Sequence, residues 1–299
     1  MRIQTHYGEL LPRDEEEIDA RTRNRKSVAY YASGALKSVY LKEASYIDSP
    51  LGRTEAEFVT FYESGELRRL FPLFGKVSGY WSEEDEIALA KVMCIELPFA
   101  RLAHKISCVS FYKSGNIKSI SFYKDEVFSF RAGKKELYGR IGLALYEDGS
   151  VRSAEPAFPQ LLSTKYGMLE VYDNQPLAIH GDRNSLQFAP DHTLLAAKSA
   201  ATGVRLHKAG LPVEEVIPEI RPSLLDLDQT VVAAITVELI AGGIRVTDSD
   251  NAVREYLEAE YEITFFKNRA YTPSADCGDC SNCVSGCYTA GRGIHKSAS

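Results

Sequence analysis

Four cysteines near the C-terminus have the residue type and spacing that most favour chemistry. They follow a C-x2-C-x2-C-x3-C pattern: Cys277, Cys280, Cys283 and Cys287. Thiolates at such intervals can wrap one face of a [4Fe–4S] cluster, and four thiolates also satisfy tetrahedral zinc. Both groups take soft ligands, so the residues alone leave iron–sulfur and zinc open. A third interpretation is a reduced or adventitiously oxidised tail that holds no metal.

The spacing of this run resembles that of bacterial ferredoxins, although Tyr288 stands where those proteins have proline. In ferredoxins the fourth cysteine of the run ligates a second cluster, and this sequence has no second run. Cys287 therefore closes the same cluster, or Cys94, Cys108 or a second chain supplies the missing thiol. His295 is an outside candidate as a further ligand. Structural zinc sites more often use two separated pairs of ligands, which ranks iron–sulfur ahead of zinc.

A second chemical candidate is the loop 180–185, which reads His-Gly-Asp-Arg-Asn-Ser. Its histidine, aspartate and serine could form a nucleophile–base–orienter set, as in a hydrolase. The same residues are also typical of a polar turn. We favour the turn, and we expect its side chains to bond to local backbone and to line no deep pocket. The sequence therefore favours a protein without enzymatic activity over an enzyme.

The elements that carry these residues are defined by an eight-residue pattern, which we call the hairpin core. It runs apolar, aromatic, any, Ser or Asp or Asn, Gly, any, aliphatic, Lys or Arg. The copies are YYASGALK (30–37), FYESGELR (61–68), FYKSGNIK (111–118), LYEDGSVR (145–152) and a degenerate VYDNQPLA (171–178). Aromatic residues favour strands, and Gly after Ser or Asp favours a tight turn. Each core thus predicts a β-hairpin with its tip at the glycine.

A fainter pattern predicts a second kind of turn, which opens the next repeat. It occurs at Thr5–Gly8, Ser49–Gly52 and Thr164–Gly167. Alternation of apolar and other residues around the hairpin cores also predicts which side chains are buried. The expected core includes Val59, Phe61, Leu67, Val109, Phe111, Ile117 and Ile120. One more hairpin is expected around Asp191-His192, between Leu186–Phe188 and Leu194-Leu195.

The hairpin cores resemble the MORN-repeat variant of bacterial proteins, in which an aromatic residue, a glycine turn and a basic return strand also recur. The resemblance covers only the short cores. It implies an array of β-hairpins that serves as a scaffold or a binding surface, and it implies no particular reaction. The longer spacing between copies here departs from that family.

The expected fold class is mainly β: an irregular array of β-hairpins with a small C-terminal α/β appendage. We divide the chain into a β-hairpin repeat domain (1–210), the appendage (211–270) and a cysteine-rich metal-binding tail (271–299). A short helix is expected near 83–92. In the appendage we expect helices at 229–241 and 251–261 and strands at 244–247 and 263–266, because Gly242-Gly243 and Asp248 or Asp250 match helix stop and start signals.

The charge balance restricts the partners. The chain has 299 residues, 35 basic and 41 acidic, for a net charge of −6. This balance disfavours nucleic-acid binding, which usually needs a basic domain. We find no signal-peptide pattern and no apolar run long enough for a transmembrane segment, and we expect a cytoplasmic protein. The clustering of four of the six cysteines favours metal binding over disulfides.

The last position of each hairpin core suggests a ligand site. Stacked hairpins would align these basic residues as a stripe that could bind an anionic ligand: Lys37, Arg68, Lys118 and Arg152. The alternative is that the charges only keep exposed strands soluble. Taken together, the residues favour a non-enzymatic scaffold or binding protein with a protein partner and a cysteine-bound metal. The alternative function is an electron-transfer protein that carries a [4Fe–4S] cluster.

Overall fold

The structure is a computed structural model in which residues 2–14, 26–74, 83–176, 181–182, 184–223 and 230–268 are described. These residues belong to one compact unit that spans residues 1–268. The expected mainly-β fold class is confirmed, since almost every described element is a strand. Within the described part of the chain, the one helix is α1 (Glu83–Leu89), close to its predicted position, and the strand β7 follows it.

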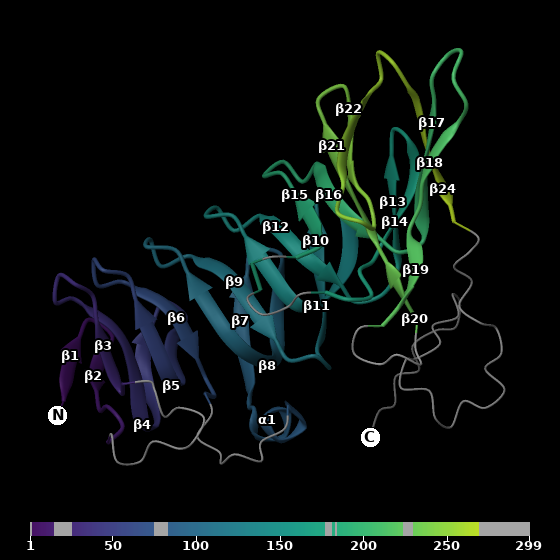
Figure 1. Ribbon diagram of the computed structural model, residues 1–299. Coiled ribbons are helices and arrows are strands. Elements are labelled where there is room, and N and C mark those ends of the chain that lie inside the picture. The colour runs from purple at the N-terminus through teal and green to yellow at the C-terminus, as the bar shows by residue number, and fades with distance from the viewer. Residues whose placement is uncertain are drawn as a thin grey trace. The chain divides into compact units, whose positions relative to one another are not determined.

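A 15-stranded antiparallel sheet holds most of the strands, and its order follows the chain from β3 to β23 (Figure 1). Its strands are β3 (Val28–Tyr30), β4 (Leu36–Ser49), β5 (Gly52–Phe61), β6 (Leu67–Phe71), β7 (Val92–Leu97), β8 (Ala100–Phe111), β9 (Ile117–Phe122), β10 (Val127–Ala132), β11 (Lys135–Leu145), β12 (Val151–Pro156), β15 (Leu186–Phe188), β16 (Leu194–Ser199), β21 (Ile235–Ile240), β22 (Gly243–Thr247) and β23 (Val253–Leu257).

The remaining strands form four small sheets. They are β1 (Ile3–Thr5) with β2 (Gly8–Leu10), β13 (Gln160–Thr164) with β14 (Gly167–Val171), β19 (Glu219–Pro222) with β20 (Thr230–Ala233), and β17 (Thr202–His207) between β18 (Glu214–Val216) and β24 (Glu262–Lys267).

The four intact hairpin cores form the predicted hairpins. They join β3 to β4, β5 to β6, β8 to β9, and β11 to β12. The turn is the same each time. In the first, the Gly34 N–H donates to the Tyr31 carbonyl (3.0 Å) and the Tyr31 N–H donates to the Ala35 carbonyl (2.8 Å). The glycine lies in the left-handed region, with φ of 85° at Gly34, where a side chain would be strained.

The tyrosine at the second position of each core ties one hairpin to the next. The Tyr31 hydroxyl donates to the Phe61 carbonyl (2.8 Å), and the Tyr62 hydroxyl donates to the Phe111 carbonyl (2.8 Å). The same bond joins Tyr112 to Leu145 (2.9 Å) and Tyr146 to Phe188 (2.8 Å). Each acceptor lies at the first position of the following core. We call this series the tyrosine ladder.

The fourth bond of the ladder identifies a fifth hairpin core that differs from the copy expected at 171–178. Tyr146 bonds to Phe188, and Ala189 to Thr193 repeat the hairpin-core turn, with His192 at φ 66° in the glycine position. The fifth core is therefore the hairpin β15–β16, around the predicted turn at Asp191-His192. Tyr172 instead forms a parallel bridge with Ser199, and residues 177 and 178 lie outside the described residues.

A one-residue register shift follows each of these five turns. In the first core Ala29 pairs with Ser38 and Tyr30 pairs with Leu36, so that Lys37 has no partner in the opposite strand. This is a β-bulge, in which the extra residue changes the direction of the bulged strand and its side chains. The unpaired residue is the last position of the core every time: Lys37, Arg68, Lys118, Arg152 and Leu195.

The register gives the main sheet two different faces. One row of paired residues is apolar, and all of its members are buried: Val39, Val59, Leu70, Val109, Ile120, Leu143, Ala154, Leu186, Ala197, Val237 and Val246. The adjacent row is mostly small and polar: Ser38, Thr60, Arg69, Ser110, Ser119, Ala144, Ser153, Gln187, Ala196 and Glu238. We call the side that carries this second row the polar face.

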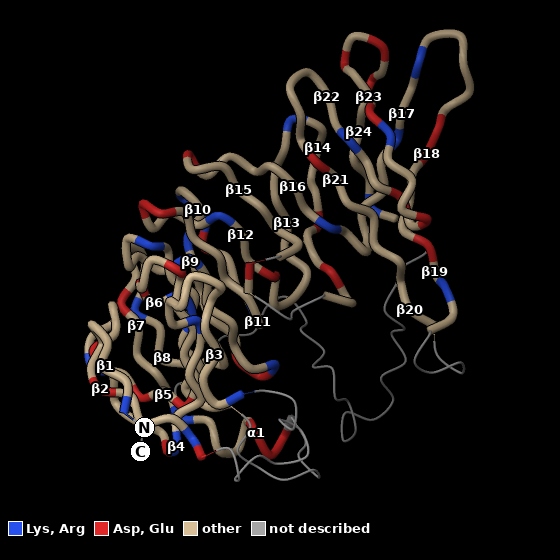
Figure 2. Tube along the Cα trace, turned by 60° about the vertical axis from the view of Figure 1, so that its left-hand side comes forward, with Lys and Arg blue, Asp and Glu red and all other residues tan. Residues whose placement is uncertain are grey.

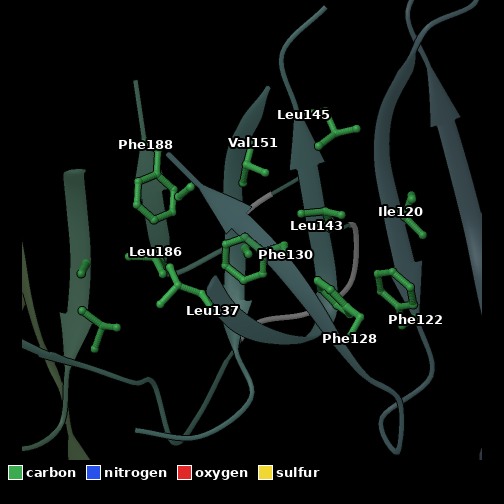
Figure 3. Packing of buried hydrophobic residues seen from close by; sticks show 14 of the residues in the cluster. Ile120, Phe122, Phe128, Phe130, Leu137, Leu143, Leu145, Val151, Leu186 and Phe188 are labelled. Carbon is green, nitrogen blue, oxygen red and sulfur yellow. The ribbon is translucent and has the colours of Figure 1, made fainter. Parts of the chain in front are cut away.

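The core lies on the apolar face. The long strands β8 and β11 leave the main pairing at register shifts, and their first halves pair with β7 and β10 instead. Phe128 and Phe130 of β10 thereby join the same cluster as Ile120 and Leu143 of the sheet (Figure 3). The Phe122 and Phe128 rings stack with centroids 4.3 Å apart. All the predicted core residues are buried except Ile117, which is partly buried.

The second kind of predicted turn is also present. At Thr5, Ser49 and Thr164 the hydroxyl donates to the carbonyl of the glycine three residues later, at 2.8, 3.0 and 2.8 Å. These turns close β1–β2, β4–β5 and β13–β14. The side chain satisfies backbone groups at the turn, as Ser and Thr commonly do.

The two helices expected in 211–270 are wrong. Within 229–241 the chain forms β20 and β21, because Thr230, Val232 and Ile235 belong to a β-branched run that favours strands. Gly242 (φ 71°) makes a hairpin turn to β22, where a helix stop had been predicted. The expected helix at 251–261 contains β23, which pairs with β22.

Asp248 caps a turn, but the turn is that of a hairpin. Its carboxylate accepts from the N–H groups of Asp250 and Ala252, both at 2.9 Å. The expected strands at 244–247 and 263–266 are confirmed as parts of β22 and β24. β16 pairs with β21, so the main sheet continues across the expected boundary at residue 211.

The tyrosine ladder predicts a measurable stability difference. Tyr62→Phe keeps the ring but removes the donor to the Phe111 carbonyl, and we expect the free energy of unfolding to fall by about 1 kcal/mol. Urea denaturation measures this quantity. Tyr30→Phe is the matched control, since Tyr30 is 52% exposed and its hydroxyl has no bonding partner among the described residues. Equal losses for the two variants would contradict the ladder.

Candidate functional site

The polar face carries two cavities. The larger, of about 990 Å³, lies over β4, β5, β6 and β8, and the smaller, of about 450 Å³, lies over β12, β15 and β16. We call them the large cavity and the small cavity. Ser38, Thr60 and Ser110 of the polar row line the large one, and Ser153 and Gln187 line the small one. The same row of the sheet therefore contributes to both.

Basic side chains gather at the large cavity because of the bulges. In the second core the unpaired Arg68 and the following Arg69 both reach the polar face, and both line the cavity. Lys37 and Ser38 do the same one hairpin earlier. With Lys26, the described lining of the cavity has four cationic residues and one carboxylate, Glu86. Figure 2 shows the basic residues of these strands as blue segments of the trace.

Neighbouring rings hold two of these cations. The Lys37 ammonium lies 5.5 Å from the centroid of the Tyr31 ring, and the Arg68 guanidinium lies 5.7 Å from that of Tyr62. Such contacts contribute about 0.5 to 1 kcal/mol at exposed positions. Among the residues that the structure describes, no carboxylate pairs with Lys37, Arg68 or Arg69. These positive charges are therefore not neutralised by described neighbours.

Aromatic rings line another side of the large cavity. Phe58 stacks on Tyr40 with centroids 4.1 Å apart and on Phe74 at 4.6 Å. Phe71 meets Phe74 edge-on at 4.8 Å. Tyr40 and Phe58 are buried, whereas Phe71 and Phe74 keep part of their surface exposed. The cavity thus presents ring surface beside cations.

The thiol in the large cavity is neutral at neutral pH. Loss of hydration raises the pKa of Cys108 to about 12, and the charge of Arg69 opposes this only in part. Cys108 is therefore a weak nucleophile, because the thiolate is the reactive form. The large cavity can bind a ligand, but it shows no activated nucleophile among its described residues.

The small cavity is lined by residues of the loop 180–185, which the sequence predicts to be a polar turn. The Ser185 N–H and hydroxyl both donate to the Glu155 carboxyl, at 2.9 and 2.8 Å. The Asn184 amide donates to the Ser153 hydroxyl (3.0 Å) and to the Gly181 carbonyl (2.8 Å). The loop is thus fixed to β12, 30 residues earlier in the chain.

The charges of the small cavity are mostly paired. Lys198 donates to the Asp173 carboxylate at 2.8 Å. The Asp173 carbonyl accepts from Arg140 at 2.8 Å, although Arg140 does not itself line the cavity. Arg152, the unpaired residue of the fourth core, donates to the Asp182 carbonyl at 3.4 Å. The small cavity therefore has far less free positive charge than the large one.

Glu155 is the most perturbed group of the small cavity. It is only 3% exposed, and burial raises the pKa of its carboxyl to about 7, although the two bonds from Ser185 favour the charged form. The nearby Asp173 raises the pKa further, and Arg140 lowers it. The carboxyl and the loop it holds are therefore sensitive to pH near neutrality.

The expectation that the side chains of the loop 180–185 would bond to local backbone holds for Asn184, which donates to the Gly181 carbonyl, and is wrong for Ser185. Asp182, Asn184 and Ser185 line the small cavity, and Ser185 is bound to a distant carboxyl. No local pattern points to Glu155, because it lies on β12, 30 residues from Ser185 in the chain, and comes next to the loop through the pairing of β12 with β15. His180 and Arg183 lie outside the described residues, so the proposed His–Asp–Ser set stays untested.

Of the other predicted site residues, some line a cavity and others lie outside the described residues. Lys37 and Arg68 of the basic stripe line the large cavity and Arg152 lines the small one, whereas Lys118 lines neither. The predicted metal ligands Cys277, Cys280, Cys283 and Cys287, with His295, lie outside the described residues. In the described ranges no group of three or more His, Cys, Asp or Glu residues is arranged to hold a metal.

Sequence reasoning missed the aromatic side of the large cavity. Tyr40, Phe58 and Phe71 lie on the same face as Ser38 and Thr60, an arrangement that the alternation within β4 and β5 could have indicated. It also missed Arg69, because the register shift after Arg68 is not visible without the pairing.

No family model, curated protein or solved structure matches the chain. None of the described helices is long and apolar enough to cross a membrane.

The raised pKa of Glu155 predicts how stability depends on pH. The folded state binds this proton more tightly than the unfolded state, in which the pKa is near 4.5, so the stabilisation is complete below about pH 4.5. It is lost as the pH rises to about 7, by on the order of 3 kcal/mol. Glu155→Gln removes the titrating carboxyl. Urea denaturation between pH 4.5 and 8 should therefore show that the free energy of unfolding of the variant increases relative to that of the wild type as the pH rises.

The control for this experiment is Glu136→Gln, at an exposed position without a described partner. It should keep the pH dependence of the wild type. If Glu155→Gln also follows the wild-type curve throughout, Glu155 is not the group that titrates near pH 7.

Proposed function

We propose that this chain is a non-enzymatic binding protein whose polar face is the binding surface, with the large cavity as a site for an anionic ligand. The observation that carries the proposal is the register shift at each hairpin core. It places the basic residues of two consecutive cores, Lys37 and Arg68, in one cavity without described carboxylate partners. Such residues attract an anion even on a protein of net charge −6, because the field at a site depends on nearby charges.

The fold supports binding over catalysis. The large cavity has hydroxyls, cations and rings on rigid strands, and its one thiol is protonated. Binding sites of this size are usually preformed and combine apolar surface with a few polar groups. The likeness of the hairpin cores to the MORN-repeat variant, itself a prediction, agrees with a scaffold role. A protein partner and a cytoplasmic location belong to the same proposal.

Tripolyphosphate is a suitable first probe of the large cavity. Isothermal titration calorimetry at low ionic strength should show one site, and Lys37→Gln with Arg68→Gln should weaken binding at least tenfold, or about 1.4 kcal/mol. Raising the salt concentration should weaken the wild type as well. The reason is that exposed cations lose attraction when they are screened.

The matched control is Lys118→Gln. Lys118 occupies the same position of a hairpin core and the same bulge, but it does not line the large cavity. This variant should bind tripolyphosphate as the wild type does. Equal weakening by the control would reduce the effect to general surface charge and contradict the proposed site.

A second candidate function rests on the cysteine run. We propose that Cys277, Cys280, Cys283 and Cys287 bind a metal, as a [4Fe–4S] cluster or as zinc, and that the cluster would make the protein an electron carrier. The spacing of the four thiols supports this proposal. The main sheet has a core of its own that ends before these residues, so metal binding and sheet folding are expected to be separable.

Metal analysis of anaerobically purified protein tests the tail. A [4Fe–4S] cluster predicts brown protein with acid-labile sulfide that bleaches in air, whereas zinc predicts colourless, air-stable protein. Cys280→Ser should lower the metal content sharply and leave the thermal unfolding of the sheet almost unchanged. Unfolding of the whole protein by this substitution would contradict the separation, and wild-type protein without metal would leave the tail as a polar extension.

A further inference from the structure

The large cavity combines two kinds of contact that together define a ligand. On one side Phe71 and Phe74 offer partly exposed rings, backed by the buried Tyr40 and Phe58. On the other side lie the free cations of the second core, Arg68 and Arg69. A simple inorganic anion would use only the second side, and a purely apolar ligand would leave the cations without a partner.

The polar row supplies the contacts between these two sides. Ser38, Thr60 and Ser110 line the large cavity from β4, β5 and β8. Ser38 and Ser110 keep part of their surface exposed. A serine hydroxyl can both donate and accept, so these two residues offer hydrogen bonds to a ligand in the cavity. The row therefore adds hydrogen-bonding groups beside the cations.

The rings favour an aromatic body over an aliphatic one. Phe58, Phe71 and Phe74 already meet one another at 4.6 to 5.2 Å, in stacked, tilted and edge-on geometries. A planar ring added to such a group gains offset-stacking or edge contacts beyond the area that it buries. The guanidinium of Arg69 can also stack on a ring while it binds an acidic group.

We propose that the large cavity binds a small aromatic anion, a ring system that carries a carboxylate, sulfonate or phosphate group. The ring lies against Phe71 and Phe74, and the acidic group lies at Arg68 and Arg69. This inference rests on the proposed function, since it names the class of ligand for the same cavity. The volume of about 990 Å³ accommodates two or three fused or linked rings, and it lies within the usual range for small-ligand sites.

Three fluorescent or competing probes test the aromatic and the anionic parts of this proposal separately. 1-Anilinonaphthalene-8-sulfonate is the aromatic anion, N-phenyl-1-naphthylamine is its neutral analogue, and octyl sulfate is an aliphatic anion. Titration of the intact protein should show one site for the sulfonate. The neutral analogue should bind at least tenfold more weakly, and octyl sulfate should be a correspondingly poor competitor.

Variants place the probe in the molecule. Arg69→Gln should weaken binding of the aromatic sulfonate about tenfold, and Phe71→Leu should weaken it several-fold, because leucine keeps apolar bulk but lacks a ring. Lys118→Gln is the control and should have no effect, since Lys118 does not line this cavity. Urea denaturation of each variant verifies folding, and the comparison of the three probes on the wild type remains decisive if Phe71→Leu fails to fold.

The outcomes distinguish this inference from the proposal on which it rests. Tripolyphosphate binding without aromatic sulfonate binding would overturn the aromatic ligand and leave the anion site in place. Equal affinity for the neutral analogue, or equal competition by octyl sulfate, would overturn the anionic or the aromatic part respectively. Sulfonate binding that neither Arg69→Gln nor Phe71→Leu changes would overturn the location. Failure of both the sulfonate and tripolyphosphate to bind would overturn both proposals.

Discussion

Side chains in a strand alternate between two faces, and a single unpaired residue after each turn resets that alternation. Without the shift, Arg68 and Arg69 would point to opposite sides of the sheet, and one of them would enter the core. With it, both reach the polar face, and Leu67 and Leu70 remain buried on the other. The charge of the large cavity and the integrity of the apolar row therefore depend on the same local irregularity.

The two cavities lie on the same face of the main sheet but differ in how their charged side chains are paired. At the large cavity Lys37 and Arg68 lie beside tyrosine rings, and neither forms an ion pair with a described carboxylate. At the small cavity Lys198 is paired with Asp173, and the bulged Arg152 donates to a loop carbonyl. The difference arises from the groups that approach the face from outside the sheet. At the small cavity Asp173, Asp182 and Asn184 bring acidic and amide groups, whereas Glu86 is the one carboxylate among the described residues that line the large cavity.

Local patterns predicted the hairpins well because their causes are local. A left-handed glycine, a strand-forming aromatic residue and a Ser or Asp before the turn act within eight residues, and Gly34 and Gly65 lie where such reasoning puts them. The fifth core escaped the pattern because His192 adopts the glycine conformation. The helix expected at 229–241 is wrong because Gly242 also suits a hairpin turn, and the β-branched run before it favours strands. Pairing between distant strands, which creates the cavity around Phe71 and the bond from Ser185 to Glu155, has no short-range signature.

The tyrosine ladder has a consequence for how such a chain can change in length. Each bond joins one hairpin core directly to the next, across 30 to 49 positions of sequence. The connections between cores take no part in it, and the entropy lost on closing a connection grows only with the logarithm of its length. Added segments such as the one that holds α1 and β7 are therefore tolerated, provided that each tyrosine still reaches the following carbonyl. The bond from each tyrosine hydroxyl keeps the distance between consecutive cores constant, so the sheet retains its geometry when the connecting loops differ in length.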